Sequence, residues 1–107
     1  MHNQLLSLLG LCRAARLCSF GHDAAKAALR EHPLRGKRAK LCLLCADASP
    51  RLREEFKWLA ENAGVPLYEI HYTSIDIKQA TQFKAVVITI DDKGFANKFA
   101  SLLTPES

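Results

Sequence analysis

Apolar residues form an unbroken run over residues 41–46, and a turn signal follows directly. Such a run is typical of a strand buried on both faces, in the middle of a sheet covered by helices. The next residues predict the start of a helix, because Ser49 suits an N-cap and Pro50 suits the first helical position. In open α/β sheets the functional surface lies beyond the carboxyl ends of the strands, so the loop over residues 46–50 is the first place to look for function.

The rest of the chain alternates between helix-like and strand-like patterns. A second apolar run, residues 85–90, predicts another fully covered strand, whereas the alternating residues 66–72 predict a half-exposed edge strand. The helices expected from periodicity and turn signals span about residues 3–15, 23–30, 50–62, 74–81 and 92–103. This alternation predicts a three-layer α/β/α sandwich formed by one domain, residues 1–107, with residues 104–107 as a frayed tail.

Several helix ends carry their own signals. Asp23 is a candidate N-cap for the second helix, and Gly64 is expected to end the third. Asp91 or Asp92 is expected to cap the last helix. The side chains expected to face inward from that helix are those of Phe95, Phe99, Leu102 and Leu103.

Composition narrows the class of protein without fixing its function. Hydrophobic residues make up 49% of the 107 residues and charged residues 24%, which is ordinary for a globular domain. The net charge of +4 permits a nucleic-acid partner but does not require one. No run of about 18 apolar residues predicts a membrane span, and the amino-terminal pattern is not that of a signal peptide. We therefore expect a cytoplasmic protein with reduced cysteines and no membrane partner.

No pattern of catalytic or metal-binding residues is present. Cys42 and Cys45 spell a CxxC pair, but residues three apart on a strand point to opposite faces and cannot share one metal ion. The four histidines form no HxxxH or HExxH pair, and no glycine-rich phosphate loop occurs. We expect no metal and no cofactor, and no catalytic triad can be assembled from the spacing of these residues.

Basic residues around the second helix are more informative. Lys26 and Arg30 are four residues apart and are expected to share one helix face. A helix start offers free N–H groups to phosphate, and nearby cations add an attraction that is independent of sequence. The alternative is an ordinary solvated helix face.

Five segments resemble, in order and spacing, a family of kink-turn-binding ribosomal proteins that includes the bacterial YlxQ-like proteins. The segments are LLGLCRAARL, GHDAAKAAL, KLCLLCADASP, GVPLYEI and VVITIDDKGFANKF. The resemblance covers nearly the whole chain. It implies an α/β/α sandwich whose mixed four-stranded sheet has the order 1-4-2-3, with one strand antiparallel, and it implies RNA binding rather than catalysis.

The resemblance also implies where RNA is bound: at the turn that begins the second helix, in the loop after the first buried strand, and in the loop over residues 82–84. Together with the helix-face argument, it gives the candidate RNA-binding residues Gly21, His22, Asp23, Lys26, Arg30, Asp47, Ala48, Ser49 and Lys84. The expected partner is structured or ribosomal RNA, with the ribosome as a further candidate and no DNA.

The sequence departs from the family at the helix start. Strong RNA binders in this family carry G-x-N-E-x-x-K, whereas this chain has Asp23, Ala24 and Ala27 at the Asn, Glu and Lys positions. Asn both donates and accepts, while an ionised Asp only accepts and repels phosphate, which disfavours base-specific kink-turn recognition. Two alternatives stay open: a protein–protein adaptor on the same fold, and a small-molecule-binding or catalytic α/β domain.

Overall fold

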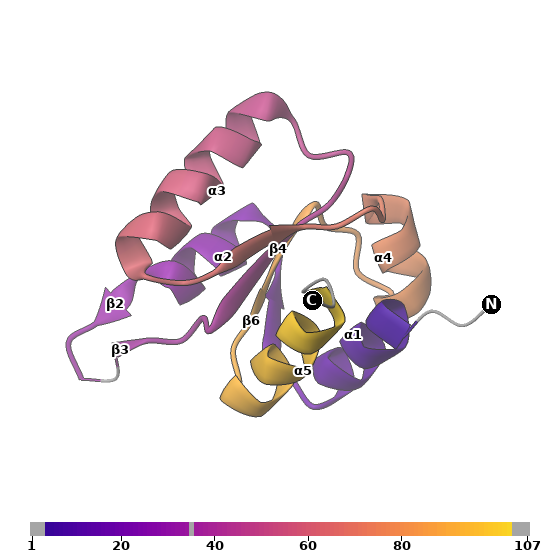
Figure 1. Cartoon of the computed structure of the whole chain (residues 1–107), viewed down its shortest axis with the longest axis horizontal. Helices are drawn as coiled ribbons and strands as arrows, with labels where there is room; N and C mark the ends of the chain where they lie inside the picture. Colours follow the sequence, from indigo (N-terminus) through magenta and orange to yellow (C-terminus); the bar gives the residue numbers. More distant parts are fainter. Residues whose placement is uncertain (1–3, 35, 104–107) are drawn as a thin grey trace.

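The computed structural model describes residues 4–34 and 36–103 (Figure 1). The expected tail, residues 104–107, lies outside the described residues. The helices are α1 (Gln4–Ala14), α2 (His22–Leu29), α3 (Pro50–Ala63), α4 (Ser74–Thr81) and α5 (Lys93–Leu103). The strands are β1 (Cys18–Phe20), β2 (Glu31–His32), β3 (Gly36–Lys37), β4 (Leu41–Leu44), β5 (Leu67–Glu69) and β6 (Val87–Ile90).

Four strands form a mixed sheet in the order β1-β6-β4-β5, while β2 and β3 pair separately as a short hairpin. Strand β6 runs antiparallel to both neighbours, and β4 and β5 are parallel. Every residue of β4 and β6 is buried, which confirms the two expected central strands. Strand β5 lies at the edge and is partly exposed, as its alternating pattern predicts.

Helices cover both faces of the sheet, so the molecule has three layers (Figure 1). Helices α1, α4 and α5 bury one face, and α2 and α3 bury the other. Strand β4 contributes Leu41 and Leu43 to the first core and Leu44 to the second. Cys42 and Cys45 lie in different cores, so the expectation that their sulfur atoms point to opposite faces is confirmed.

Local signals explain most helix ends. The Ser49 hydroxyl accepts a hydrogen bond from the Leu52 amide, Pro50 begins α3, and Gly64 ends it in a left-handed conformation, all as expected. Of the two candidates for the start of α5, Asp92 is the one that accepts from a first-turn amide, that of Phe95.

Two expectations about α2 are wrong. Asp23 does not cap the helix, because Gly21 occupies the N-cap position and Asp23 lies inside the first turn. Arg30 does not share a helix face with Lys26, because α2 ends at Leu29 and Arg30 is already extended. After Arg30 the chain enters the β2–β3 hairpin.

The packing of α1 and α5 also differs from expectation in part. Leu102 does not face inward, since 41% of its surface is exposed, whereas Phe99 is fully buried. In α1, Gly10 lies close to α4, where a Cβ would be 3.3 Å from the carbonyl oxygen of Ala80.

Candidate nucleic-acid interface

Three segments that are far apart in the sequence meet at one end of the sheet. The Gly21 amide donates to the Val87 carbonyl over 2.9 Å, so the start of α2 lies against the start of β6. The Cys45 amide donates to the Val86 carbonyl over 2.8 Å, so the loop after β4 also lies there. The family resemblance implied RNA contacts from the start of α2, from the loop after β4 and from residues 82–84, which lie just before β6.

Glycine determines the geometry at the start of α2. Gly21 has φ 96° and ψ 168°, a region that residues with a Cβ rarely occupy. It carries no side chain to accept from the first amides of the helix, and no side-chain cap is present. The N–H groups of the first turn therefore stay available to an external acceptor such as a phosphate oxygen.

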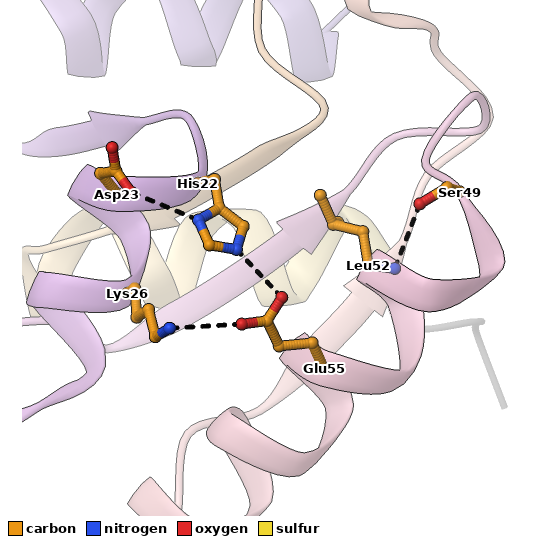
Figure 2. A network of polar contacts seen from close by, with 6 residues as sticks. All are labelled: His22, Asp23, Lys26, Ser49, Leu52 and Glu55. Carbon is orange, nitrogen blue, oxygen red and sulfur yellow. Dashed lines mark hydrogen bonds and ion pairs between the residues drawn. The ribbon is translucent and has the colours of Figure 1, made fainter.

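Next to this helix start, Glu55 of α3 binds both His22 and Lys26 (Figure 2). Its two carboxylate oxygens lie 2.9 Å from His22 Nε2 and 3.4 Å from Lys26 Nζ. The His22 ring also packs edge-on against Phe56, with 5.4 Å between ring centroids. Lys26 is therefore partly neutralised by an acidic neighbour that the sequence pattern did not indicate.

These contacts change the protonation of the pair. The hydrogen bond to Glu55, followed by that to Asp23, raises the pKa of His22 above its ordinary value. The same hydrogen bond from His22 is the main cause of the lowered pKa of Glu55. The two carboxylates therefore favour the protonated form of His22 and offset its positive charge.

The loop after β4 is held by contacts within the protein. Asp47 accepts from the Ser74 amide over 2.9 Å and from the Ser74 hydroxyl over 2.7 Å, so it supports the start of α4. Ala48 is buried, and Ser49 caps α3. All three candidate residues of this loop thus have structural contacts, and an RNA contact for them remains a prediction.

Arg53 organises the same loop, and the sequence pattern gave no signal for this. Its guanidinium donates to the carbonyl oxygens of Ala46 and Ala48, and it forms an ion pair with Glu69 at the edge of the sheet. An arginine on an exposed helix face cannot be assigned to backbone acceptors before the loop geometry is known.

The two remaining candidates are placed differently. Lys84 is exposed, and its charge contributes to the lowered pKa of Asp47, whose main cause is the hydrogen bond from the Ser74 hydroxyl. Lys84 therefore lies near the three converging segments. Arg30 follows the last residue of the eight-residue helix α2, at the opposite end from Gly21. An RNA contact for Arg30 therefore stays a prediction that its position does not support.

Nothing in the described part of the chain forms a metal-binding cluster of three or more His, Cys, Asp or Glu side chains. Burial raises the pKa of Cys42 and of Cys45 to about 12, which keeps both thiols protonated. None of the described helices has the length and apolar character that crossing a membrane requires.

Comparison with known proteins finds a relative in sequence and similar solved structures, while no family model matches. The RNA-binding protein YlxQ of Bacillus subtilis is 33% identical over 96 residues, which are 90% of this chain and 91% of that one. A protein of unknown function from Bacillus halodurans superposes with a TM-score of 0.83 at 24% identity, covering 95% of this chain and 98% of that one. The Giardia lamblia 15.5kD RNA binding protein superposes with a TM-score of 0.67 at 21% identity, covering 96% and 88%, and supports the fold.

Proposed function

Since this chain belongs to the YlxQ-like branch of the kink-turn-binding ribosomal-protein family, we propose that it is a non-enzymatic RNA-binding protein. The proposed partner is structured RNA, of the ribosomal or kink-turn-like kind, and the proposed location is the cytoplasm. The observation that carries the proposal is the uncapped start of α2, which lies beside the loop after β4 and the loop that contains Lys84.

The chemistry of this end of the sheet suits a phosphate backbone. Free amides at a helix start attract anions, and Lys84 adds an exposed charge nearby. Asp23 opposes this attraction, because its carboxylate is fully exposed at the same helix start. The balance favours recognition of RNA shape and backbone over readout of base edges.

A direct titration tests the proposal. A standard kink-turn RNA, a fully paired duplex and an unstructured RNA of equal length are each titrated with the protein in gel-shift and calorimetric experiments. We expect salt-dependent binding that is tightest for the kink-turn RNA, because a bent RNA can contact all three segments at once. Equal, weak and salt-independent binding to all three would contradict the proposal.

Two lysine variants locate the phosphate contacts. Lys84→Ala should weaken binding of every RNA and reduce the slope of log affinity against log salt by about one unit, since one phosphate contact is lost. Lys26→Ala should have a smaller effect, because Glu55 already neutralises part of the Lys26 charge. Salt titrations of both variants provide the measurement, and a larger effect for Lys26→Ala would show that RNA displaces Glu55.

A second candidate function, that of a protein–protein adaptor, has one observation in its favour. A groove of about 690 Å³ between α1 and α5 is lined by Leu8, Leu11 and Leu102, and Leu11 is 63% exposed. Apolar side chains on a surface groove are typical of a partner-binding face. None of the residues that line this groove is a candidate RNA-binding residue, so the two functions can be tested separately.

A further inference from the structure

Trp58 is the single tryptophan of the chain, and it lies on the outer side of α3. Phe56, two residues earlier, is fully buried, so Trp58 projects from nearly the opposite side of the helix and is 63% exposed. Within residues 4–34 and 36–103, no aromatic ring packs on Trp58 and no cation lies over it. An exposed tryptophan is the side chain most typical of a binding hot spot.

The helix surrounds this ring with acidic side chains. On a helix surface, the neighbours of a residue are those three and four positions away. For Trp58 these are Glu54, Glu55, Glu61 and Asn62, which are three carboxylates, one amide and no cation. The Asn62 side-chain amide donates to the Trp58 carbonyl over 2.8 Å. The surroundings of the indole ring on α3 are therefore negative.

Two of these carboxylates stay available to a ligand. Glu54 and Glu61 are exposed, and neither forms an ion pair within the described part of the chain. Glu55 differs from them, because a histidine and a lysine of α2 already bind it. The negative charge beside Trp58 thus comes mainly from Glu54 and Glu61.

The cations of α3 do not compensate this charge. Arg53 and Lys57 both pair with Glu69 at the edge of the sheet. Arg51 lies at the start of the helix, about two turns before Trp58. The surface around Trp58 is therefore acidic, although the chain as a whole has a net charge of +4.

An aromatic ring among carboxylates suits a cation. The face of an indole ring attracts a positive charge, and nearby carboxylates add to the attraction. A phosphate would be repelled by Glu54 and Glu61, and a purely apolar partner would remove water from them without supplying a hydrogen bond. An arginine side chain fits best, because its planar guanidinium can stack on the ring while it donates to a carboxylate.

We infer that the Trp58 surface, formed by Trp58, Glu54 and Glu61, binds an arginine side chain in a basic segment of a partner protein. This surface is separate from the RNA patch, since its charge has the opposite sign. It does not depend on the proposed function, because neither Trp58 nor the two carboxylates is a candidate RNA-binding residue.

The probe is a short peptide of alternating arginine and glycine with blocked ends, titrated into the protein at low salt. Because Trp58 is the only tryptophan, its fluorescence reports on this site alone. We expect a saturable change in fluorescence that weakens as salt is added. A matched peptide with lysine in place of arginine should bind about 2- to 10-fold more weakly. A matched peptide with citrulline, which lacks the charge, should leave the fluorescence unchanged.

Variants of the three residues are measured by the anisotropy of a labelled arginine peptide. Trp58→Leu should weaken binding by about 2- to 30-fold, the loss expected when one cation–π contact is removed. Glu54→Gln and Glu61→Gln should each weaken binding by about 2- to 5-fold at low salt and by less at high salt. All three side chains are exposed, so the fold should persist, and circular dichroism checks this.

Two matched variants test whether these effects belong to the Trp58 surface. Asp23→Asn removes one negative charge from an exposed position on α2 and should leave peptide affinity unchanged. Phe83→Leu removes an aromatic that is 47% exposed, but whose ring already stacks with Phe20 and lies 4.8 Å from the guanidinium carbon of Arg13. It should also leave peptide affinity unchanged, because that ring already has a cation.

Losses of affinity in the Trp58, Glu54 and Glu61 variants, with none in the two controls, would support the inference. The inference is overturned if the arginine peptide binds Trp58→Leu as tightly as wild type, or if the citrulline peptide binds as tightly as the arginine peptide. It is also overturned if a kink-turn RNA changes the Trp58 fluorescence and Trp58→Leu weakens RNA binding, because the surface would then belong to the RNA interface.

Discussion

Helix starts with and without a side-chain cap lie close together at the end of the sheet where the loop after β4 lies. Helices α3 and α4 begin with full side-chain caps: Ser49 caps α3, and Thr73 with Asp76 forms a capping box on α4 that Asp47 supports. Helix α2 begins at Gly21 with no side-chain cap. The chain thus satisfies its own amides at two starts and leaves those of the third open.

The two kinds of helix start differ in what they contribute. A capped start stabilises the fold, whereas an uncapped start is suited to a ligand. A side-chain cap contributes about 0.5–2 kcal/mol to stability because it satisfies amides that would otherwise have no partner. An uncapped start forgoes that contribution, and at Gly21 the helix also depends on a backbone conformation that only glycine adopts readily. An anion bound at this start would supply the missing acceptor.

The largest expected effect comes from Gly21→Ala. An alanine at φ 96° should lower the free energy of unfolding by about 1–3 kcal/mol, because the Cβ is strained by its own backbone although no other atom lies within 4 Å. It should also reduce RNA affinity by tilting the start of α2. Urea unfolding and gel shifts measure the two effects.

Gly36→Ala is the matched control, since Gly36 also has a positive φ, with open space around it, in the β2–β3 hairpin. It should lower stability while leaving RNA affinity unchanged. Equal losses of RNA affinity in both variants would indicate that the start of α2 is not part of the interface.

A smaller effect is expected from Asp47→Ala, which removes support from the start of α4. The free energy of unfolding should fall by about 1 kcal/mol at neutral pH. The pKa of Asp47 is lowered in the folded protein, so its contribution is present above the unfolded value of about 3.9 and is lost as pH falls through the folded value. The difference in the free energy of unfolding between Asp47→Ala and wild type should therefore become smaller as the pH is lowered.

Ser49→Ala is the control for Asp47→Ala, because it removes a helix cap from the same loop without removing a carboxylate. At neutral pH, Ser49→Ala should lower the free energy of unfolding by about as much as Asp47→Ala does. In acid, the loss caused by Ser49→Ala should not become smaller. Urea unfolding of both variants at several pH values between about 3 and 7 makes the measurement. If the two variants showed the same pH dependence, Asp47 would not act through its ionised form.

Local sequence signals predicted the parts of the fold that depend on neighbouring residues. The buried strands β4 and β6, the Ser49–Pro50 start and the Gly64 end each follow from a short pattern with one physical cause. The end of α2 did not follow from such a pattern. Arg30 continues the helical pattern in the sequence, whereas tertiary contacts take the chain into the β2–β3 hairpin.

The candidate site was predictable only as three segments, and their mutual contacts were not. Glu55 lies 33 residues from His22 in the sequence, and no periodicity shows which carboxylate of α3 faces α2. The Phe20–Phe83 stack likewise depends on the pairing of β1 with β6, which places the ends of two distant segments together. Lys26 therefore looked like a free cation in the sequence, although Glu55 pairs with it.

The smallest expected effect concerns Glu55, the residue that links the capped helix α3 to the uncapped helix α2. Glu55→Gln removes the negative charge beside His22 and Lys26, so RNA affinity should rise by roughly two- to fivefold at low salt and by less at high salt. Glu61→Gln, the same change near the other end of α3, should leave affinity unchanged.

The same variant should alter the response to pH. In wild type the pKa of His22 is raised, first by Glu55 and then by Asp23, so its contribution to stability is fully present below the unfolded value of about 6.5 and is lost as pH rises through the folded value. Glu55→Gln removes the larger of these two causes of the raised pKa of His22. The loss of RNA affinity as His22 deprotonates should then begin at a lower pH. Titration of the His22 ring by NMR, alongside RNA binding between about pH 5.5 and 8.5, makes the measurement. An unchanged midpoint would mean that Glu55 does not control the charge at the start of α2.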